Sequence, residues 1–351
     1  MKILVVGDGR SAIHEVAVVG AFKQLGHQVE PFYWQNYFSA SNPLVVLWRR
    51  AQNKFLIGPT INRLNRDLVK KAVEFGPQLI FIYRGTHITP RTLIELKLSL
   101  PACELFGYNN DDPFAAGHPP WLWRHFMNCV PIYHLVFAYR HRNLDDFLKI
   151  GAKRVELLRS WFLPELHKST GVNPNYASDC MFVGHYEDDC RAECLEALIM
   201  SGVKLKLFGP YMGLKESGWD IPISKSNALQ SLLPVSYLSG QEYVNALNST
   251  PIALCFLSKL NKDTYTRRCF EIPAIGSALF SEYSDDLASM FIDGEEAVFF
   301  RNKEELVHKV KYYLAHEDQL QRIRENGTNR VIRDGHDIYS RLRAVLELVG
   351  K

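Results

Sequence analysis

The sequence lacks several features that would assign it to a familiar class of protein. Its seven cysteines form no C-x-x-C pair and their number is odd, which argues against a disulfide framework and against a paired-cysteine zinc site. It contains no apolar run of 18 residues and no signal-peptide pattern, so we expect no membrane-spanning helix and a cytoplasmic location, where cysteines stay reduced. Internal repeats and low-complexity tracts are also missing.

The opening of the chain lacks the complete glycine fingerprint of a dinucleotide-binding protein. MKILVVGDG (1–9) reads as a buried strand, and a helix (12–26) and a second strand (27–34) follow, which predicts a βαβ unit. Gly7 and Gly9 are not followed by a third glycine, and the second strand has no acidic residue at its end to hold a ribose. We therefore expect a doubly wound α/β sheet that does not bind NAD.

At 351 residues the chain suits two domains, and its charge divides unevenly between them. Residues 1–170 hold 21 Lys and Arg against 13 Asp and Glu, a net +8, whereas residues 171–351 hold 20 against 25, a net −5. This division indicates that the first half meets something anionic, although ordinary scatter of surface charge would also explain it. Residues 41–75 interleave basic and apolar side chains, which fits an anionic membrane, an acidic ligand, or two helices packed on the sheet.

Three further apolar segments of the first half end in polar residues. QLIFIY (78–83) leads to Arg84 and His87, ELFGY (104–108) leads to the sequence NNDDP, and HLVFAY (134–139) leads to Arg140. Active sites of open α/β sheets collect at the carboxyl ends of parallel strands. Turn chemistry explains NNDDP by itself, but not the concentration of polar residues after three strands.

A second α/β unit follows a stretch that reads as an interdomain linker (160–179). It opens with the strand CMFVGHY (180–186), which contains Gly184 and His185; a helix (188–202) and a strand ending at Gly209 come next. Both halves thus begin with a Rossmann-like unit.

The last third of the chain holds the most informative segment, RRCFEIPAIGS (267–277). It follows the apolar strand PIALCFL (251–257) and places Arg268 and Glu271 three residues apart near the start of a short helix. At such a helix start an arginine suits phosphate groups and a carboxylate suits the two hydroxyls of a ribose. The alternative is a surface ion pair between the two side chains.

The order of motifs after this segment resembles the C-terminal half of group 1 glycosyltransferases, and most closely the CgeB-like, spore-maturation-type branch. The likeness covers about residues 240–349 and includes a G-E-E motif, a helix (303–323) that opens with E-E-L, and a final His-to-Arg segment. The matching positions are Arg268, Phe270, Glu271, Ala274, Gly276, Gly294, Glu295, Glu296, Glu304, Glu305, Leu306, Gly327, His336 and Arg341. One position departs from related retaining enzymes, which carry a glutamate where this chain has Asp263.

The resemblance implies the GT-B fold, with two Rossmann-like domains that face each other across a cleft. We expect an N-terminal acceptor domain (1–165), a nucleotide-sugar domain (175–335), and a C-terminal helix (336–351) that packs back on the first domain. The implied activity is transfer of a hexose from a nucleotide-diphosphate sugar to a glycan, lipid-linked or protein acceptor, as in polysaccharide biosynthesis.

The sequence also predicts that this transfer needs no metal and no further cofactor. None of its 17 aspartates forms the D-x-D motif with which the other large glycosyltransferase fold binds a metal. Cations and backbone N–H groups must then meet the charge of the leaving group. The residues expected to bind the nucleotide sugar are Gly184, His185, Gly209, Asp263, Arg268 and Glu271. Lys259 and Lys262 are either further candidates or solvated loop residues.

The first domain supplies the expected catalytic and acceptor residues. We expect Asp112, and less strongly Asp111, to project into the cleft and to act on the acceptor hydroxyl, because each follows a strand end. His14 lies shortly after the first glycine loop, which in such enzymes faces the reaction centre; a structural place on the crossover helix is the alternative. Arg84, His87 and Arg140 are assigned to an acceptor that is anionic or lies at the inner face of a membrane, and no nucleic acid is expected.

Two other functions fit the same sequence. A nucleotide-sugar epimerase shares the fold but needs no separate acceptor. A non-catalytic nucleotide-sugar-binding module would explain the departure at Asp263.

Overall fold

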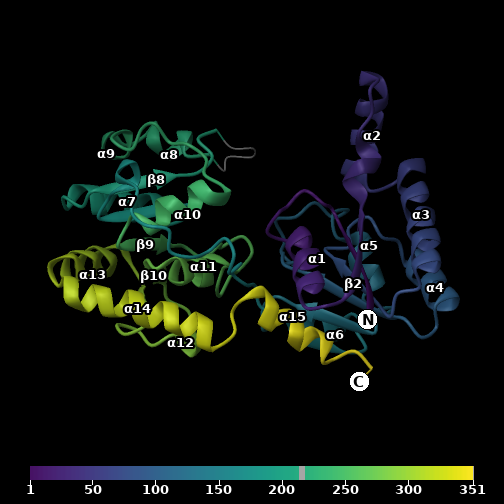
Figure 1. Ribbon diagram of the computed structural model, residues 1–351. Helices are drawn as coiled ribbons and strands as arrows, with labels where there is room; N and C mark the ends of the chain where they lie inside the picture. Colours follow the sequence, from purple (N-terminus) through teal and green to yellow (C-terminus); the bar gives the residue numbers. More distant parts are fainter. Residues whose placement is uncertain (213–217, 351) are drawn as a thin grey trace. The chain divides into compact units, whose positions relative to one another are not determined.

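The computed structural model describes residues 1–212 and 218–350 of the chain (Figure 1). They form two compact units, each with its own parallel sheet. The first unit comprises Met1–Ser160 and the stretch that begins at Ile338, and the second comprises Trp161–Asp337. The stretch expected to link two domains (160–179) therefore lies almost entirely in the second unit.

The first unit is built on a six-stranded sheet in which every pair of neighbours is parallel, in the order β2-β1-β3-β4-β5-β6. Its strands are β1 (Lys2–Gly7), β2 (Gln28–Tyr33), β3 (Leu79–Tyr83), β4 (Glu104–Asn109), β5 (Leu135–Ala138) and β6 (Val155–Leu157). The helical segments are α1 (Glu15–Gln24), η1 (Trp34–Phe38), α2 (Pro43–Phe55), α3 (Pro59–Phe75), α4 (Pro90–Ser99), α5 (Arg124–Cys129), α6 (Arg142–Lys149) and α15 (Ile338–Leu346). The sequence had not predicted β6.

The central strands of this sheet are buried along almost their whole length. The sequence of β3, LIFIY, is apolar at every position and all five residues are buried, as expected where helices cover both faces of a parallel sheet. Helix α3 begins at Pro59 after a glycine and turns the apolar residues Ile61, Leu64 and Leu68 toward this core.

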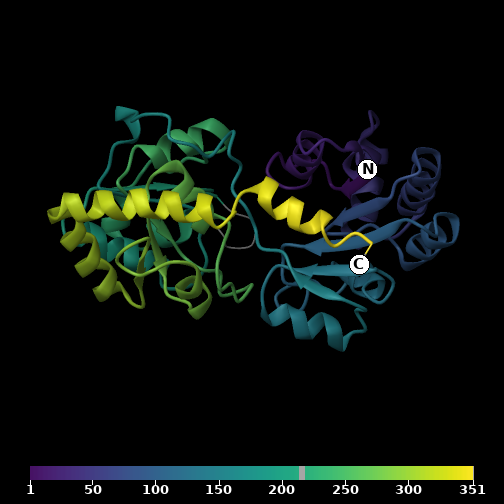
Figure 2. The ribbon, with the colours of Figure 1, turned by 60° about the horizontal axis from the view of Figure 1, so that its bottom comes forward.

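The end of the chain returns to the first unit, which confirms the expected crossing helix. In Figures 1 and 2 the chain leaves the second unit after α14 and places α15 on the first, where it packs against α1. Tyr339 donates a hydrogen bond to Gln24, and the backbone N–H of Gly350 donates to Glu104 at 2.8 Å.

The second unit holds a five-stranded parallel sheet in the order β11-β10-β9-β7-β8. Its strands are β7 (Cys180–Val183), β8 (Leu205–Phe208), β9 (Ile252–Cys255), β10 (Ala278–Glu282) and β11 (Val298–Phe300). The helical segments are η2 (Pro174–Tyr176), α7 (Arg191–Met200), α8 (Asp220–Ile223), α9 (Asn227–Gln230), α10 (Gly240–Asn248), α11 (Arg268–Ile275), α12 (Asp285–Met290), α13 (Lys303–Ala315) and α14 (Glu317–Arg333). Two parallel sheets with flanking helices confirm the expected α/β class.

One expected helix proves to be two. The single helix predicted over 303–323 is interrupted at His316, which ends α13 and precedes α14. Helix α14 then continues past the predicted end and includes Gly327. A Cβ at Gly327 would lie 2.6 Å from the carbonyl oxygen of Glu296, so this glycine serves close packing rather than a helix end.

Candidate functional sites

The sheet of the second unit has a topological switch point between β7 and β9. From β7 the chain continues to β8 on one side, whereas β9 is followed by β10 on the other. Connections that leave in opposite directions open a crevice beyond the carboxyl ends of the strands, where α/β proteins bind ligands. The loops after β7 and β9, residues 184–190 and 256–267, lie at this edge. We refer to it as the second carboxyl edge.

Glu187 is the centre of a polar cluster at the second carboxyl edge. Its Oε1 lies 2.9 Å from Nε2 of His185, and its Oε2 accepts hydrogen bonds from the hydroxyl of Ser258 at 3.1 Å and from the backbone N–H of Lys259 at 3.2 Å. Burial by itself would raise the pKa of Glu187, but the hydrogen bond with His185 and the charge of Arg191 lower it to about 2. The cluster therefore joins the loops after β7 and β9 through one ionised carboxylate, which no sequence motif had indicated.

Glu282, at the end of β10, holds the same β9 loop from the other side. Its carboxylate accepts from the backbone N–H of Leu257 at 2.6 Å and from Nζ of Lys259 at 2.8 Å. Burial tends to lower the pKa of Lys259, but its hydrogen bond and ion pair with Glu282 outweigh this and raise it. Lys259 is thus neither a free cation nor a merely solvated residue.

Glu271 lies on α11, and its ion pair is with Arg267 rather than with Arg268, the partner in the alternative interpretation of the spacing. Its carboxylate is buried and contacts Arg267 by an ion pair, Tyr243 by a hydrogen bond of 2.9 Å, and His167 at 3.6 Å. Burial would raise the pKa of Glu271, but the charge of Arg267 is the main influence that holds it below its usual value. In this arrangement both carboxylate oxygens have protein partners.

Arg268, the residue directly after Arg267, has a different environment. It is half-buried at the start of α11, and it makes no hydrogen bond or ion pair with residues 1–212 or 218–350. Asp263 lies half-buried in the preceding loop, where its backbone N–H donates to the carbonyl of Ser258 at 2.9 Å. The structure therefore leaves Arg268 without a hydrogen bond or ion pair to a carboxylate in the described chain, although its charge helps to lower the pKa of Glu271.

The two glycines predicted to bind the nucleotide sugar have a packing role. A Cβ at Gly209 would lie 2.1 Å from the carbonyl oxygen of Gly184, and that oxygen accepts a hydrogen bond of 2.8 Å from the indole of Trp219. Any side chain at Gly209 would therefore separate the ends of β7 and β8. Contact of either glycine with a nucleotide remains a prediction.

The sheet of the first unit has its own switch point, between β1 and β3. Charged residues gather at this first carboxyl edge: Arg10 Nε lies 3.6 Å from Asp8, and Arg84 Nη2 lies 2.5 Å from Asp111. Burial raises the pKa of Asp8, although the charges of Arg10 and Arg84 oppose it. The sequence had indicated Arg84 and Asp111 as site residues, but not Asp8. The position of Asp8 directly after a glycine, in the loop that follows β1, was the signal that could have identified it.

Asp112 does not project outward as expected. The residue is fully buried, and its Oδ1 accepts hydrogen bonds from the backbone N–H of Phe114 and from the amide of Asn143, both at 3.0 Å. These bonds fix the turn after β4, because a carboxylate that bonds the backbone two residues on stabilises such a turn. Asp111 is partly exposed and is therefore the carboxylate of this pair that a ligand can reach.

His14 lies at the same edge, immediately before α1. Its ring stacks on Tyr83, the last residue of β3, with ring centroids 5.6 Å apart. The next residue, Glu15, is buried and accepts a hydrogen bond of 2.6 Å from the backbone N–H of Gly9, which holds the β1 loop closed. The role of Glu15 could not be recognised from the sequence, since a single acidic residue at a helix start usually indicates only a favourable interaction with the helix dipole.

The two other residues assigned to an acceptor are buried. His87 stacks on Trp34 with ring centroids 4.9 Å apart, and its Nε2 lies 2.7 Å from the Oδ1 of Asn53. Burial is the main cause that lowers the pKa of His87 to about 3, so the ring is neutral near pH 7. Arg140 is also buried, with its guanidinium 4.7 Å from the ring centroid of Tyr139. Neither side chain is exposed to an acceptor in this conformation.

A cavity of about 530 Å³ opens beside the first carboxyl edge. Its polar and charged lining comes from the β1 loop, η1, the following loop and α2: Arg10, Gln35, Asn36, Ser39, Arg50 and Asn53. It contains two arginines and no acidic side chain, so its chemistry suits an anionic group.

Among the described residues, no group of three or more His, Cys, Asp or Glu side chains is arranged to hold a metal ion. All seven cysteines are free thiols. The helices of the described part are each too short or too polar to cross a membrane.

Comparison with known proteins identifies the fold. A family model described as glycosyl transferase-like matches residues 191–347. Sucrose-phosphate synthase from Thermosynechococcus elongatus superposes with a TM-score of 0.69 at 12% identity, covering 99% of this chain and 98% of that one. The chain has the GT-B fold. Its matched part carries a glycosyl transferase-like domain that includes α11 and both of its arginines.

Other solved structures with this fold agree over the whole chain. Anabaena HepE in complex with UDP-glucose gives a TM-score of 0.67 at 13% identity, covering 99% of this chain and 98% of that one. A glycosyltransferase from Rickettsia africae gives 0.68 at 12% identity, covering 99% and 97%. No curated protein sequence matches the chain.

Proposed function

We propose that this protein is a metal-independent glycosyltransferase that moves a hexose from a nucleotide-diphosphate sugar to an acceptor. The observation that carries the proposal is the glycosyl transferase-like match over residues 191–347, which contains α11. The UDP-glucose bound to HepE, a protein of the same fold, makes UDP-sugars the first donors to test. The free thiols are consistent with action in a reducing compartment such as the cytoplasm.

In this proposal the second carboxyl edge holds the donor. Arg268 meets the diphosphate, because it lies at a helix start and lacks a carboxylate partner among the described residues. His185 and the backbone of the loop after β7 lie at the switch point, where Glu187 contacts His185, and they are proposed to meet the same donor. Glu271 positions Arg267 and the helix start, and it reaches a ribose only if its present contacts open.

The first carboxyl edge then receives the acceptor, and Asp111 is the residue proposed to take or orient its hydroxyl proton. Asp111 is partly exposed and is oriented by Arg84, whereas Asp112 is buried. The cavity that contains Arg10 and Arg50 supports an acceptor with an anionic group, such as a phosphate or carboxylate on a glycan or lipid carrier. This part of the proposal predicts transfer that weakens as salt screens the charges.

A panel of nucleotide sugars tests the proposal. Each donor is titrated into the protein by calorimetry, and the mixtures are then analysed by mass spectrometry with and without candidate acceptors. We expect at least one donor to bind. That donor should be hydrolysed slowly when no acceptor is present, and a new glycoside should form when an acceptor is added. Epimerised donor without transfer would identify an epimerase, binding without turnover would identify a binding module, and the absence of any binding would refute all three.

A further inference from the structure

Helix α2 turns its apolar face away from the protein. Leu44, Leu47, Trp48 and Phe55 recur at the spacing of one helical face, yet the first three are 78%, 67% and 55% exposed and Phe55 is also exposed. Ile57, two residues after the helix, continues this exposed apolar surface. Of the 22 large apolar side chains exposed in the described part of the chain, six lie within residues 44–57.

The polar side of the same helix faces its own unit. Gln52 is the buried residue of α2, and its Oε1 accepts a hydrogen bond of 2.8 Å from the backbone N–H of Thr60. Asn53 contacts the buried ring of His87, and Arg49 donates to the carbonyl of Ser39. A surface helix of a globular protein normally shows the opposite arrangement. The outward apolar stripe of Leu44, Leu47, Trp48 and Phe55 therefore requires a different explanation.

The charge around the stripe is of one sign. Residues 31–66 contain five Lys and Arg and no Asp or Glu. Arg50 and Lys54 border the stripe on α2, and neither forms an ion pair within the described chain. Both side chains are exposed, and Figure 1 shows α2 standing out from the rest of its unit.

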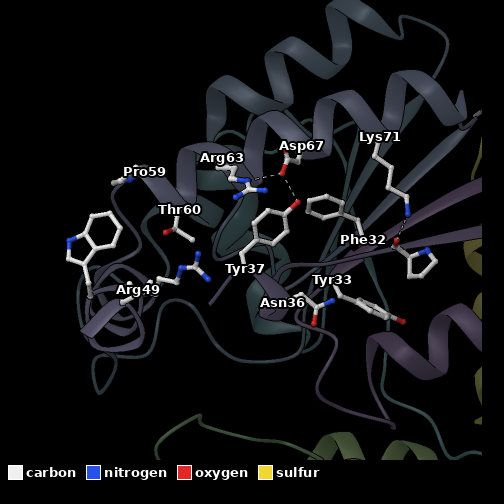
Figure 3. A pocket seen from close by; sticks show the side chains of 13 residues that line it. Phe32, Tyr33, Asn36, Tyr37, Arg49, Pro59, Thr60, Arg63, Asp67 and Lys71 are labelled. Atoms are coloured by element: carbon white, nitrogen blue, oxygen red, sulfur yellow. Dashed lines mark hydrogen bonds and ion pairs between the residues drawn. The ribbon is translucent and has the colours of Figure 1, made fainter. Parts of the chain in front are cut away.

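A second basic surface adjoins the helix. A cavity of about 740 Å³ lies between α2, α3 and η1, and Trp48 belongs both to its lining and to the apolar stripe. Figure 3 shows Arg63 and Tyr37 directed at Asp67, the single acidic side chain of the lining. Lys71 donates a hydrogen bond of 2.9 Å to the carbonyl of Pro31. The lining also includes Arg49, so cations outnumber acids here as well.

We propose that α2 docks this protein on an anionic lipid bilayer. The helix would lie in the plane of the interface, with Leu44, Leu47 and Trp48 among the acyl chains and with Arg50 and Lys54 at the lipid phosphates. Its 13 residues span about 20 Å, too short to cross a bilayer but ample for such a contact. A second copy of this chain fits poorly, because two acid-free basic surfaces would repel each other. The inference goes beyond sugar transfer, since docking requires no donor.

Sedimentation with lipid vesicles tests the proposal without any enzymatic assay. Vesicles of phosphatidylcholine alone are compared with vesicles that contain about 30% phosphatidylglycerol. We expect the wild type to bind the anionic vesicles at least about tenfold more tightly. The double variants Leu44→Ser/Leu47→Ser and Arg50→Glu/Lys54→Glu should each reduce that binding by about tenfold or more.

Matched controls separate docking from loss of structure. Leu98 on α4 is 79% exposed, and Leu98→Ser with Arg91→Glu alters the same residue types on another helix of the first unit. These controls should bind as the wild type does, and all variants should keep its circular dichroism spectrum. Equal binding to neutral and anionic vesicles, or unchanged binding of both α2 variants, would overturn the proposal. So would a wild-type dimer that Leu44→Ser/Leu47→Ser converts to monomer while no vesicle is bound.

Discussion

The Glu187 cluster gives the sharpest physical prediction, because one carboxylate joins two loops of the second carboxyl edge. Replacing Glu187 with Gln removes its charge but keeps the shape and one acceptor oxygen. The pKa of Glu187 is lowered from 4.5 to about 2 in the folded protein. At 1.36 kcal/mol for each pKa unit, this difference corresponds to about 3 kcal/mol of folding free energy at neutral pH.

Screening reduces the value that we expect to measure. His185 is about half exposed, so its contribution is weakened by solvent, and we expect Glu187→Gln to cost about 2 kcal/mol near pH 7. Because the folded pKa is the lower one, the stabilisation is complete above the unfolded value of 4.5 and is lost as the pH falls toward 2. At about pH 3.5 the cost of the substitution should therefore be roughly 1 kcal/mol.

Urea unfolding followed by circular dichroism at both pH values measures this difference. Glu193→Gln on α7 is the matched control, because Glu193 is exposed and its ion pair with Lys303 at 3.3 Å lies on the surface. That control should change the free energy of unfolding by less than about 0.5 kcal/mol at either pH. An equal cost of Glu187→Gln at both pH values, or a cost no greater than that of the control, would refute the reasoning.

Three further predictions concern single residues of the two edges. Arg268→Ala should weaken UDP binding in calorimetry by about tenfold or more while leaving the thermal midpoint unchanged, because its guanidinium has no carboxylate partner in the described chain. Gly209→Ala should lower the free energy of urea unfolding by about 3 kcal/mol or more, since its Cβ would meet the Gly184 carbonyl at 2.1 Å. Asp111→Asn should reduce transfer by about 10²–10⁴-fold with donor binding intact, whereas Asp112→Asn should mainly lower the thermal midpoint; the opposite pattern would reverse the two assignments.

The sequence predicted the fold better than it predicted the sites. Apolar strands such as LIFIY (79–83) and their glycine and polar ends indicated both parallel sheets, because burial of a strand on two faces leaves a continuous apolar run. The break at His316 was missed, since the apolar periodicity of α13 and α14 continues across it. Strand β6 was missed because all three of its residues are only half-buried and carry no such signal.

The candidate sites depended on tertiary contacts that a sequence pattern does not contain. Helical spacing allows Glu271 to pair with an arginine three or four residues before it, and in the fold its partner is Arg267. Tyr243 and His167 contact the same carboxylate, and the sequence pattern contains neither contact. Likewise, the sequence favoured Asp112 over Asp111 as the reactive carboxylate, but hydrogen bonds from Phe114 and Asn143 hold Asp112 inside the turn after β4.

The charges of the second carboxyl edge determine which cation is available to a diphosphate. Three carboxylates of this edge already have cationic partners: Glu187 with Arg191, Glu271 with Arg267, and Glu282 with Lys259. A cation held by a carboxylate has part of its charge neutralised, and breaking a buried pair to bind a ligand would leave an uncompensated charge behind. Arg268 forms no hydrogen bond or ion pair within the described chain that a diphosphate would have to break, and its helix start adds partial positive charge. We therefore propose Arg268, rather than Lys259 or Arg267, as the cation that meets the diphosphate of the proposed donor.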